Sequence, residues 1–186
     1  MATEPGGGAV AAYVGIGSNL ADPELQVRRA FEALAGLPDS RLLACSPLYR
    51  TAPVGPQDQP DYVNAVARLE TRLSAPGLLA VLQAIERSRG RVRDGSRWGP
   101  RILDLDILLF GGACIDRPGL HLPHPELANR AFALVPLADV APADLSVPGL
   151  GSLASMLDRC PREGVERLGP GTGCDSSDRL AECAAT

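Results

Sequence analysis

The sequence of 186 residues contains no lysine, and all 18 of its basic residues are arginine. A P-loop lysine, a Schiff-base lysine and a lysine general base are therefore excluded. The chain also lacks an apolar run of the ~20 residues needed to cross a bilayer, and its N-terminus lacks the basic and apolar stretches of a signal peptide. The net charge of −4 gives no reason to expect nucleic-acid binding. We expect a cytoplasmic protein with no membrane or nucleic-acid partner.

Metal-binding cysteine and histidine patterns are also missing. None of the five cysteines forms a C-x-x-C pair, which excludes a zinc ribbon and a redox dithiol. The wide spacing of these residues predicts reduced thiols in a cytosolic protein; they are Cys45, Cys114, Cys160, Cys174 and Cys183. The only histidines, His121 and His124, have no cysteine or glutamate at metal-ligand spacing. We therefore expect no zinc site, although a histidine could donate a hydrogen bond to a phosphate.

The length fits one domain with one core. Residues 1–9 are glycine-rich and predict a flexible N-terminal tail. Apolar periodicity continues to about residue 162, so the folded domain is expected over 10–162. Residues 163–186 lose that periodicity and contain Gly-Pro-Gly-Thr-Gly, which predicts a disordered C-terminal tail.

The order of the predicted elements indicates the fold class. Strands are expected over 10–16, 41–49, 62–73 and 102–110, with helices over 23–35 and from about 76 to 89. Shorter helices are expected near 125–129 and 152–159, and irregular loops over 52–61 and 91–100. This order predicts an α+β fold with a ferredoxin-like antiparallel sheet, in a single domain with the helices packed on one face. The other face would be free to host a ligand.

Two carboxylates, Asp104 and Asp106, interrupt the apolar run 102–110. In a strand, alternate side chains share a face about 6.6 Å apart, so both acids would point the same way. The leucines and isoleucine at 103, 105, 107 and 109 would then face the core. Carboxylate oxygens suit Mg²⁺, which is commonly held by one or two carboxylates plus substrate phosphates. The alternatives are two solvated acids, or acids paired with Arg101.

Six arginines lie within fifteen residues just before and beside the acid pair. Guanidinium groups match phosphate oxygens bidentately, so the cluster predicts a polyphosphate site. A solvated helix end explains the first two members of the cluster but not the four that follow Gly90. The six are Arg87, Arg89, Arg91, Arg93, Arg97 and Arg101. Trp98 lies among them and could either stack on a base or anchor the loop.

Tyr62 and Asn64 begin a predicted strand directly after the proline-rich loop 52–61. With a period of two they point the same way, and a ring beside an amide suits a flat heterocycle. An exposed strand end is the alternative. Gln83 and Glu86 lie three residues apart on one helix face, where a solvated polar face is the default interpretation.

These blocks together resemble a known enzyme family. The run Arg97-Trp98-Gly99-Pro100-Arg101-x-x-Asp104-Leu105-Asp106-Ile107 closely resembles the signature of the 6-hydroxymethyl-7,8-dihydropterin pyrophosphokinase family of folate biosynthesis. Other matching blocks are Gly15-Ile16-Gly17-Ser18-Asn19-Leu20, Tyr49-Arg50-Thr51, Gly55-Pro56-Gln57-Asp58-Gln59-Pro60-Asp61-Tyr62-Val63-Asn64, Gly90-Arg91-Val92-Arg93 and Pro123-His124. The resemblance covers roughly residues 10–160. Two positions depart from the family pattern: Ala52, where proline is frequent, and Pro125, where an aromatic residue is expected.

The resemblance implies a ferredoxin-like diphosphotransferase that moves the β,γ-pyrophosphoryl group of ATP to the pterin hydroxymethyl oxygen, leaving AMP. Asp104 and Asp106 would hold two Mg²⁺ ions and, with Arg91 and Arg101, form the catalytic set. The pterin would contact Gly17, Thr51, Val54, Tyr62, Asn64 and Phe132. The ATP positions would be Gln83, Glu86, Arg91, Arg93, Trp98, Arg101, Ile107, His124 and Arg130.

Further expectations concern mechanism and assembly. In the family, Arg91 and Arg93 lie on a loop that closes over the substrates, and closure would exclude water. The sequence offers no obvious protein base, which favours metal assistance. We expect a monomer. The residue pattern leaves two other classes of protein open: a metal-dependent nucleotidyl- or glycosyltransferase, and a pterin- or nucleotide-binding protein without catalysis.

Overall fold

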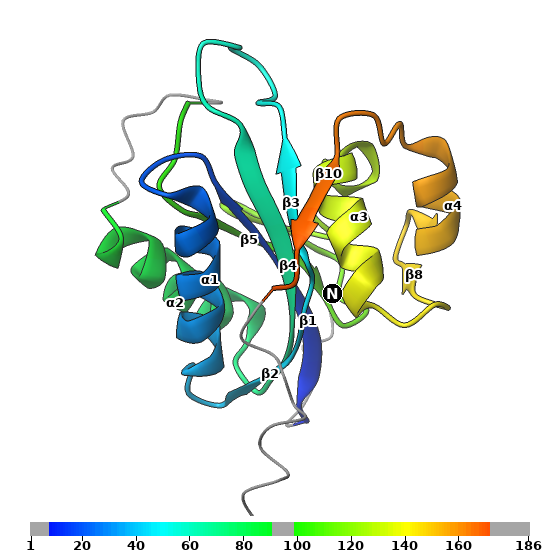
Figure 1. Cartoon of the computed structure of the whole chain (residues 1–186). Coiled ribbons are helices and arrows are strands. Elements are labelled where there is room, and N and C mark those ends of the chain that lie inside the picture. The colour runs from blue at the N-terminus through cyan, green and yellow to red at the C-terminus, as the bar shows by residue number, and fades with distance from the viewer. Residues whose placement is uncertain (1–7, 91–98, 172–186) are drawn as a thin grey trace, which may run out of the picture.

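One antiparallel sheet forms the centre of the protein. The computed structural model describes residues 8–90 and 99–171. The sheet order is β10-β3-β4-β1-β5, and β2 also pairs with β4 (Figure 1). The strands are β1 (Val10–Ser18), β2 (Ser40–Cys45), β3 (Leu48–Thr51), β4 (Tyr62–Thr71), β5 (Asp104–Phe110) and β10 (Glu166–Gly169). Among the described residues, no helix is both long and apolar enough to cross a membrane.

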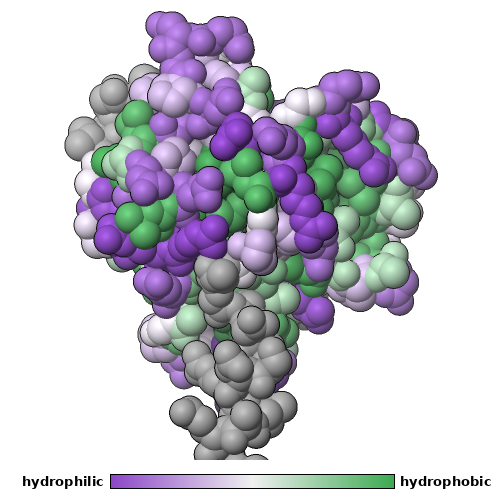
Figure 2. All heavy atoms as spheres, in the orientation of Figure 1, coloured by the Kyte–Doolittle hydropathy of each residue, from purple (hydrophilic) through white to green (hydrophobic). Residues whose placement is uncertain are grey.

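Helices lie on both sides of this sheet (Figure 1). One face packs against α1 (Pro23–Ala35) and α2 (Ala75–Ser88), and the other against α3 (Ala131–Val140) and α4 (Leu153–Arg159). The single α+β domain with an antiparallel sheet is confirmed. The prediction that the helices pack on one face holds for α1 and α2 only. Helices α3 and α4 cover part of the other face, which was expected to be free. Apolar side chains appear in the middle of Figure 2 and toward α4, among a mostly polar surface.

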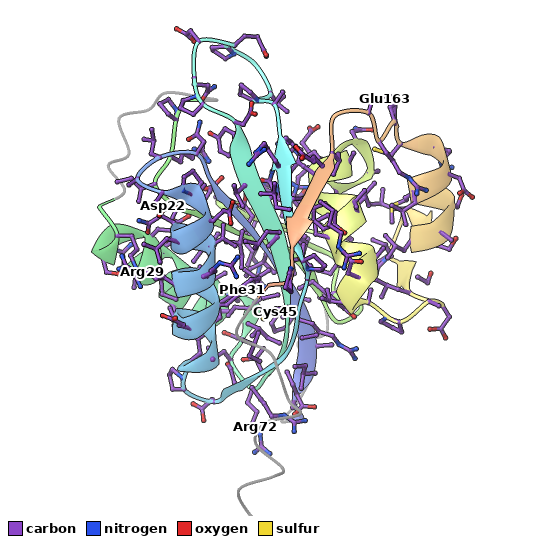
Figure 3. The ribbon with its side chains drawn as sticks, in the orientation of Figure 1. Asp22, Arg29, Phe31, Cys45, Arg72 and Glu163 are labelled. Atoms are coloured by element: carbon purple, nitrogen blue, oxygen red, sulfur yellow. The ribbon has the colours of Figure 1, made fainter. Side chains whose placement is uncertain are left out.

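Helix α1 illustrates how local signals place an element. The Asp22 side chain accepts a hydrogen bond from the Leu25 amide at 3.3 Å, and Pro23 occupies the first turn. Residues at helical spacing, including Phe31, are fully buried. Phe31 points from α1 toward the sheet near Cys45, whereas Arg29 lies on the outer side (Figure 3). Burial of a phenylalanine contributes about 1.5–3 kcal/mol, so this face holds α1 against the sheet.

The predicted strand 41–49 is two strands, β2 and β3, separated at Ser46 and Pro47. The Ser46 amide donates to the Val66 carbonyl at 2.9 Å, and the Ser46 hydroxyl accepts from the Val66 amide at 2.9 Å. A side chain thus takes the place of a backbone acceptor, and the following proline has no amide to continue the ladder. Both strands still pair with β4.

Strand β5 carries a bulge that overturns one detail of the predicted alternation. Its register against β1 shifts between Tyr13 and Val14, so that Leu109 pairs with Tyr13 and Ile107 with Val14. The extra residue, Leu108, reverses the alternation beyond it. Leu109 therefore packs in the cluster on the α3 side, and not with Leu105 and Ile107 on the α1 side.

Between β5 and α3 the chain forms small elements. The hairpin of β6 (Ile115–Arg117) and β7 (Leu120–Leu122) and the helix α3 were not foreseen. Helix α3 is apolar almost all round and contains Pro136, two features that hide a surface-helix pattern. The helix predicted near 125–129 is the 3₁₀ helix η1 (Leu127–Asn129), and α4 confirms the helix predicted at 152–159. A short pair, β8 (Ser146–Val147) with β9 (Gly151–Ser152), precedes α4.

The prediction of a disordered tail from residue 163 is wrong for its first part. After the turn at Glu163 (Figure 3), the chain returns as β10 and pairs with β3, where Arg50 and Glu166 form an ion pair at 3.4 Å. Two apolar residues in the segment were too few to give a pattern. Residues 172–186 lie outside the described residues. The expectation of reduced thiols is also wrong for Cys45, which is disulfide-bonded, whereas Cys114 and Cys160 are free.

Candidate functional site

A cavity of about 260 Å³ opens on the sheet face that α3 covers only in part. It lies where β1, β4 and β5 run side by side, between the loop after β3 and the start of α3. The lining residues are Gly15, Ile16, Gly17, Thr51, Ala52, Val54, Tyr62, Asn64, Ala65, Arg101, Asp104, Asp106, Leu108, His124, Leu127, Arg130, Phe132 and Ala133. The cavity thus joins residues from five separate segments of the chain, 15–17, 51–54, 62–65, 101–108 and 124–133.

Two glycines of the central strand β1 form the floor. Gly17 pairs with Asn64 of β4 on one side and with Asp104 of β5 on the other. A Cβ atom on Gly17 would come within 3.3 Å of the Asn64 side-chain oxygen, and one on Gly15 within 3.2 Å of Leu108. The missing side chains therefore leave the space in which neighbouring strands present their polar groups.

A polar pair forms one wall. The Asn64 amide nitrogen donates to the Thr51 hydroxyl at 2.8 Å, and both residues are buried. Beside them, the Tyr62 hydroxyl donates to the Gly99 carbonyl at 3.0 Å. Burial, the largest cause, raises the pKa of Tyr62. Tyr62 thus stays a neutral ring held by its hydroxyl, with the fixed Asn64 amide next to it.

The acid pair forms the opposite wall, as the alternation predicted. Asp104 Oδ2 accepts from Arg101 Nη1 at 2.5 Å. Burial alone would lower the pKa of Arg101, but attraction by Asp104 and the hydrogen bond to it outweigh burial and raise that pKa. Burial first, and the charges of Asp104 and Glu86 second, raise the pKa of Asp106 to about 6 against the opposing attraction of Arg130 and Arg101. Arg101 thus pairs with one acid, and the other remains poorly solvated among negative charges.

His124 and the beginning of α3 complete the rim. The His124 amide donates to the Leu108 carbonyl at 2.9 Å, which fixes the residue beside β5. Burial first, and the charge of Arg130 second, lower the pKa of His124 and keep it neutral. Because His124 Nδ1 accepts from the Glu126 amide at 3.2 Å, the ring proton resides on Nε2. The Arg130 guanidinium lies 5.7 Å from the centre of the Phe132 ring.

Three residues expected at the nucleotide position lie outside the cavity lining: Gln83, Glu86 and Ile107. Ile107 faces the core on the α1 side, and Glu86 is 2% exposed. Glu86 Oε1 accepts from the Leu105 amide at 2.8 Å, which covers the outer edge of β5. The backbone groups of Ile107, two residues further, point to the same outer edge. Any contact of Ile107 with a ligand would therefore use its backbone.

Most of the other expected site residues line the cavity. All six positions expected to contact a pterin line the cavity, together with Arg101, Asp104, Asp106, His124 and Arg130. Arg91, Arg93 and Trp98 lie outside the described residues. Sequence reasoning missed Gly15 and Leu108, each two residues from a predicted site residue, so that a period of two could have found them. Ala52, one of the departures from the family pattern, also lines the cavity.

The described residues contain no group of three or more His, Cys, Asp or Glu side chains that could hold a metal ion. The acid pair nevertheless fits a divalent cation, because its oxygens are hard donors that a substrate phosphate can complement. The pKa of Asp106 is raised because burial, and then repulsion by Asp104 and Glu86, outweigh the attraction of Arg130 and Arg101.

The sequence itself matches the family described as 7,8-dihydro-6-hydroxymethylpterin-pyrophosphokinase (HPPK) over residues 13–142. The chain belongs to the HPPK family. This matched region contains every residue that lines the cavity.

Members of the HPPK family from two bacteria align with this chain over most of their length. A 2-amino-4-hydroxy-6-hydroxymethyldihydropteridine pyrophosphokinase of Pseudomonas aeruginosa is 55% identical over 156 residues, covering 84% of this chain and 95% of that protein. The protein of the same name from Haemophilus influenzae is 44% identical over 161 residues, covering 87% of this chain and 99% of that protein.

Solved structures agree on the fold. The wild-type Plasmodium falciparum HPPK-DHPS structure superposes with a TM-score of 0.63 at 13% identity, over 81% of this chain and 44% of that one. This chain thus spans less than half of that longer protein. The low identity restricts this likeness to the fold, whereas the sequence match carries the family assignment.

Proposed function

We propose that the cavity binds 6-hydroxymethyl-7,8-dihydropterin and Mg²⁺-ATP and transfers the β,γ-pyrophosphoryl group of ATP to the pterin hydroxymethyl oxygen, releasing AMP. One observation carries this proposal. The six residues matched to the pterin position and the two acids matched to the metal position come from distant parts of the chain and line the same cavity. The reaction would supply the pterin diphosphate for folate biosynthesis.

The pterin lies between the rings of Tyr62 and Phe132 in this proposal. The fixed side chains of Asn64 and Thr51 present an amide and a hydroxyl to the edge of the heterocycle, and the backbones at Gly17 and Val54 complete that edge. Because the Asn64–Thr51 hydrogen bond already exists, little side-chain entropy remains to be lost on binding. The missing Cβ at Gly17 keeps the floor flat for a planar ring.

The acids hold two Mg²⁺ ions in this proposal, as the family resemblance implies. Mg²⁺ bound there would neutralise phosphate oxygens and activate the hydroxymethyl oxygen. Arg101 keeps Asp104 oriented through their ion pair. The partial desolvation of Asp106 strengthens its attraction for a cation.

In this proposal, two arginines and a neutral histidine donate hydrogen bonds to the phosphates of the nucleotide. Arg101 and Arg130 present guanidinium groups to phosphate oxygens, and neutral His124 offers its Nε2 proton as a donor without adding charge. Glu86 and the backbone of Ile107 lie at the outer edge of β5, where they would meet the nucleoside in this proposal, together with Gln83 from the preceding turn of α2. Arg91, Arg93 and Trp98 supply the closing loop in this proposal. Positioning and charge neutralisation are the main requirements of phosphoryl-group transfer.

Product analysis tests this function. The purified protein is incubated with ATP, Mg²⁺ and 6-hydroxymethyl-7,8-dihydropterin, and nucleotides and pterins are separated by chromatography. We expect AMP and pterin diphosphate in equal amounts. Either ADP or released pyrophosphate would contradict the proposal. Released pyrophosphate would favour the nucleotidyltransferase class, whereas ADP would indicate transfer or hydrolysis of the γ-phosphoryl group alone. Binding of both substrates without any product would favour a binding protein.

The monomeric state and the cytoplasmic location stay predictions from the sequence. Light scattering of the purified protein at micromolar concentration tests the first, with one 19.4 kDa species expected. Cell fractionation tests the second.

A further inference from the structure

Asn19 follows directly after β1 and is 1% exposed, yet it does not line the cavity. Its side chain and backbone bind two segments that each contribute residues to the lining of the cavity. One is the segment 99–102, which carries Arg101, and the other is the loop 52–61, which carries Val54 and leads into Tyr62. Asn19 is therefore a junction behind the site.

On the first side, Asn19 holds the backbone of Arg101 by two hydrogen bonds. The Arg101 amide donates to Asn19 Oδ1 at 2.7 Å, and the Asn19 amide donates to the Arg101 carbonyl at 3.0 Å. The Arg101 guanidinium in turn binds Asp104. The position of Asn19 is thus transmitted through one residue to an acid of the proposed metal site.

On the second side, Asn19 Nδ2 donates to the Gln59 side-chain oxygen at 3.0 Å and to the Pro60 carbonyl at 3.1 Å. The loop is organised internally by its own amides. Gln57 Nε2 donates to the carbonyls of Pro53 and Gly55, each at 2.9 Å, and Gln59 Nε2 donates to the Pro56 carbonyl at 3.0 Å. Because these bonds link the loop from end to end, a shift at Gln59 reaches the part of the loop that lines the cavity.

The chemistry of this position requires a carboxamide. One oxygen accepts from Arg101 while two N–H groups donate to two carbonyl oxygens. An aspartate would present an acceptor to both loop oxygens, and a serine would supply one donor. Since the residue is buried, any unmade bond would leave a polar group without solvent.

We propose that Asn19 is a positioning residue that couples pterin binding at the loop 52–61 to nucleotide binding at the Arg101–Asp104 pair. This inference rests on the proposed function, because it assigns the two substrates to the two sides that Asn19 joins. Ordering of either side by its ligand fixes Asn19, which then orders the other side. Coupling of this kind is reciprocal, so each substrate tightens the binding of the other.

The test measures pterin affinity by calorimetry with and without saturating Mg²⁺ and α,β-methylene-ATP, whose α–β bridge cannot be cleaved. The ratio of the two dissociation constants is the coupling factor. For the wild type we expect about tenfold, within the usual range for coupled sites. For Asn19→Ala we expect a factor below about 2, with a folded protein verified by thermal melting.

Ser18→Ala is the matched control. The Ser18 hydroxyl is fully buried and donates to the Ile102 carbonyl at 2.6 Å, so it ties β1 to the same segment without touching the loop 52–61. Its loss removes a buried hydrogen bond of similar kind, but the coupling factor should stay within twofold of the wild type. A purely structural role of Asn19 would lower both affinities and leave the ratio unchanged.

Gln59→Ala is a second variant that tests the same coupling if Asn19→Ala does not fold. Gln59 is half-buried, and its truncation removes one of the two hydrogen bonds from Asn19 to the loop, together with the Gln59–Pro56 bond, while the bonds from Asn19 to Arg101 remain. We expect at least a threefold fall in the coupling factor. The proposal would be overturned if the coupling factor of Asn19→Ala lay within twofold of the wild-type value. If Asn19→Ala does not fold, the same criterion applies to Gln59→Ala. A wild-type coupling factor near 1 would also overturn the proposal. Formation of ADP in place of AMP would instead refute the proposed function and leave the coupling result standing.

Discussion

Arg101 and Asp104 lie three residues apart and form an ion pair at 2.5 Å, whereas Asp106, two residues further, faces the same cavity with a raised pKa. The two acids look equivalent in the sequence, yet the fold gives them different surroundings. Asp104 has an adjacent guanidinium, whereas the half-buried Asp106 is repelled by Asp104 and Glu86 more strongly than Arg130 and Arg101 attract it. This difference allows the two acids to be separated by experiment.

Asp106→Asn should stabilise the metal-free protein and abolish turnover. The substitution removes a half-buried, poorly solvated charge that is repelled by Asp104 and Glu86. In chelator at about pH 7.5, we expect the melting temperature to rise by about 2–4 °C, which corresponds to about 1 kcal/mol in a chain of this size. Asp104→Asn, which loses its Arg101 partner, should give no rise. With Mg²⁺ added, the wild type alone should gain stability.

The pH dependence of this effect has a definite sign. Because the pKa of Asp106 rises from 3.8 to about 6 on folding, the ionised form opposes folding. The stability difference between Asp106→Asn and the wild type should be complete above about pH 6 and should shrink as the pH falls toward 4. A difference that grows on acidification, measured by melting in chelator, would contradict the assignment.

Thr51→Val should weaken pterin binding. The valine fills the space but cannot accept the hydrogen bond from Asn64, which leaves a buried amide unsatisfied and free to rotate. We expect about a tenfold loss of pterin affinity and about 1–2 kcal/mol of stability, measured by calorimetry and denaturant unfolding. Thr71→Val is the matched control, because Thr71 is a fully buried threonine at the other end of β4, hydrogen-bonded to Ser40 at 2.7 Å. Equal losses of pterin affinity in both variants would count against a binding role for Thr51.

Tyr49→Phe should alter alkaline stability. The Tyr49 hydroxyl donates to Asp139 at 2.7 Å, and burial followed by this bond raises the pKa of Tyr49 to about 12. An unfolded tyrosine loses its proton near pH 10, so the contribution of Tyr49 to stability is complete below pH 10 and declines from there toward pH 12. The phenylalanine variant should lose about 1 kcal/mol at pH 8 and show less of this alkaline decline. Denaturant unfolding at several pH values measures both, and an identical slope in the two proteins would contradict the assignment.

Truncation tests the role of β10. A chain that ends after residue 162 lacks the strand that pairs with β3, so the edge of the sheet becomes exposed. We expect a loss of about 1–3 kcal/mol and increased aggregation, relative to a control chain that ends after residue 171. Equal stability of the two chains would show that β10 adds nothing to the sheet.

The elements that the sequence predicted correctly are those whose residue pattern lies within a short stretch of the chain. Asp22 and Pro23 predicted the start of α1, and alternation placed Tyr62 with Asn64 and Asp104 with Asp106 on one face. Helix α3 and strand β10 were missed because an almost entirely apolar helix and a short edge strand carry no amphipathic pattern of their own. The displacement of Leu109 could not be foreseen either, since a bulge forms between two strands.

The sequence by itself determined the family and the chemistry, because the acids, arginines and ring residues stand in short local blocks whose spacing survives without any fold. Only the tertiary structure decided which of these residues meet. It brought Thr51, Asn64, Asp106 and Phe132 around one cavity, and it set Glu86 against the Leu105 backbone. It also gave Asp104 and Asp106 different environments, because burial and neighbouring charge arise from strands and helices that are distant in the chain.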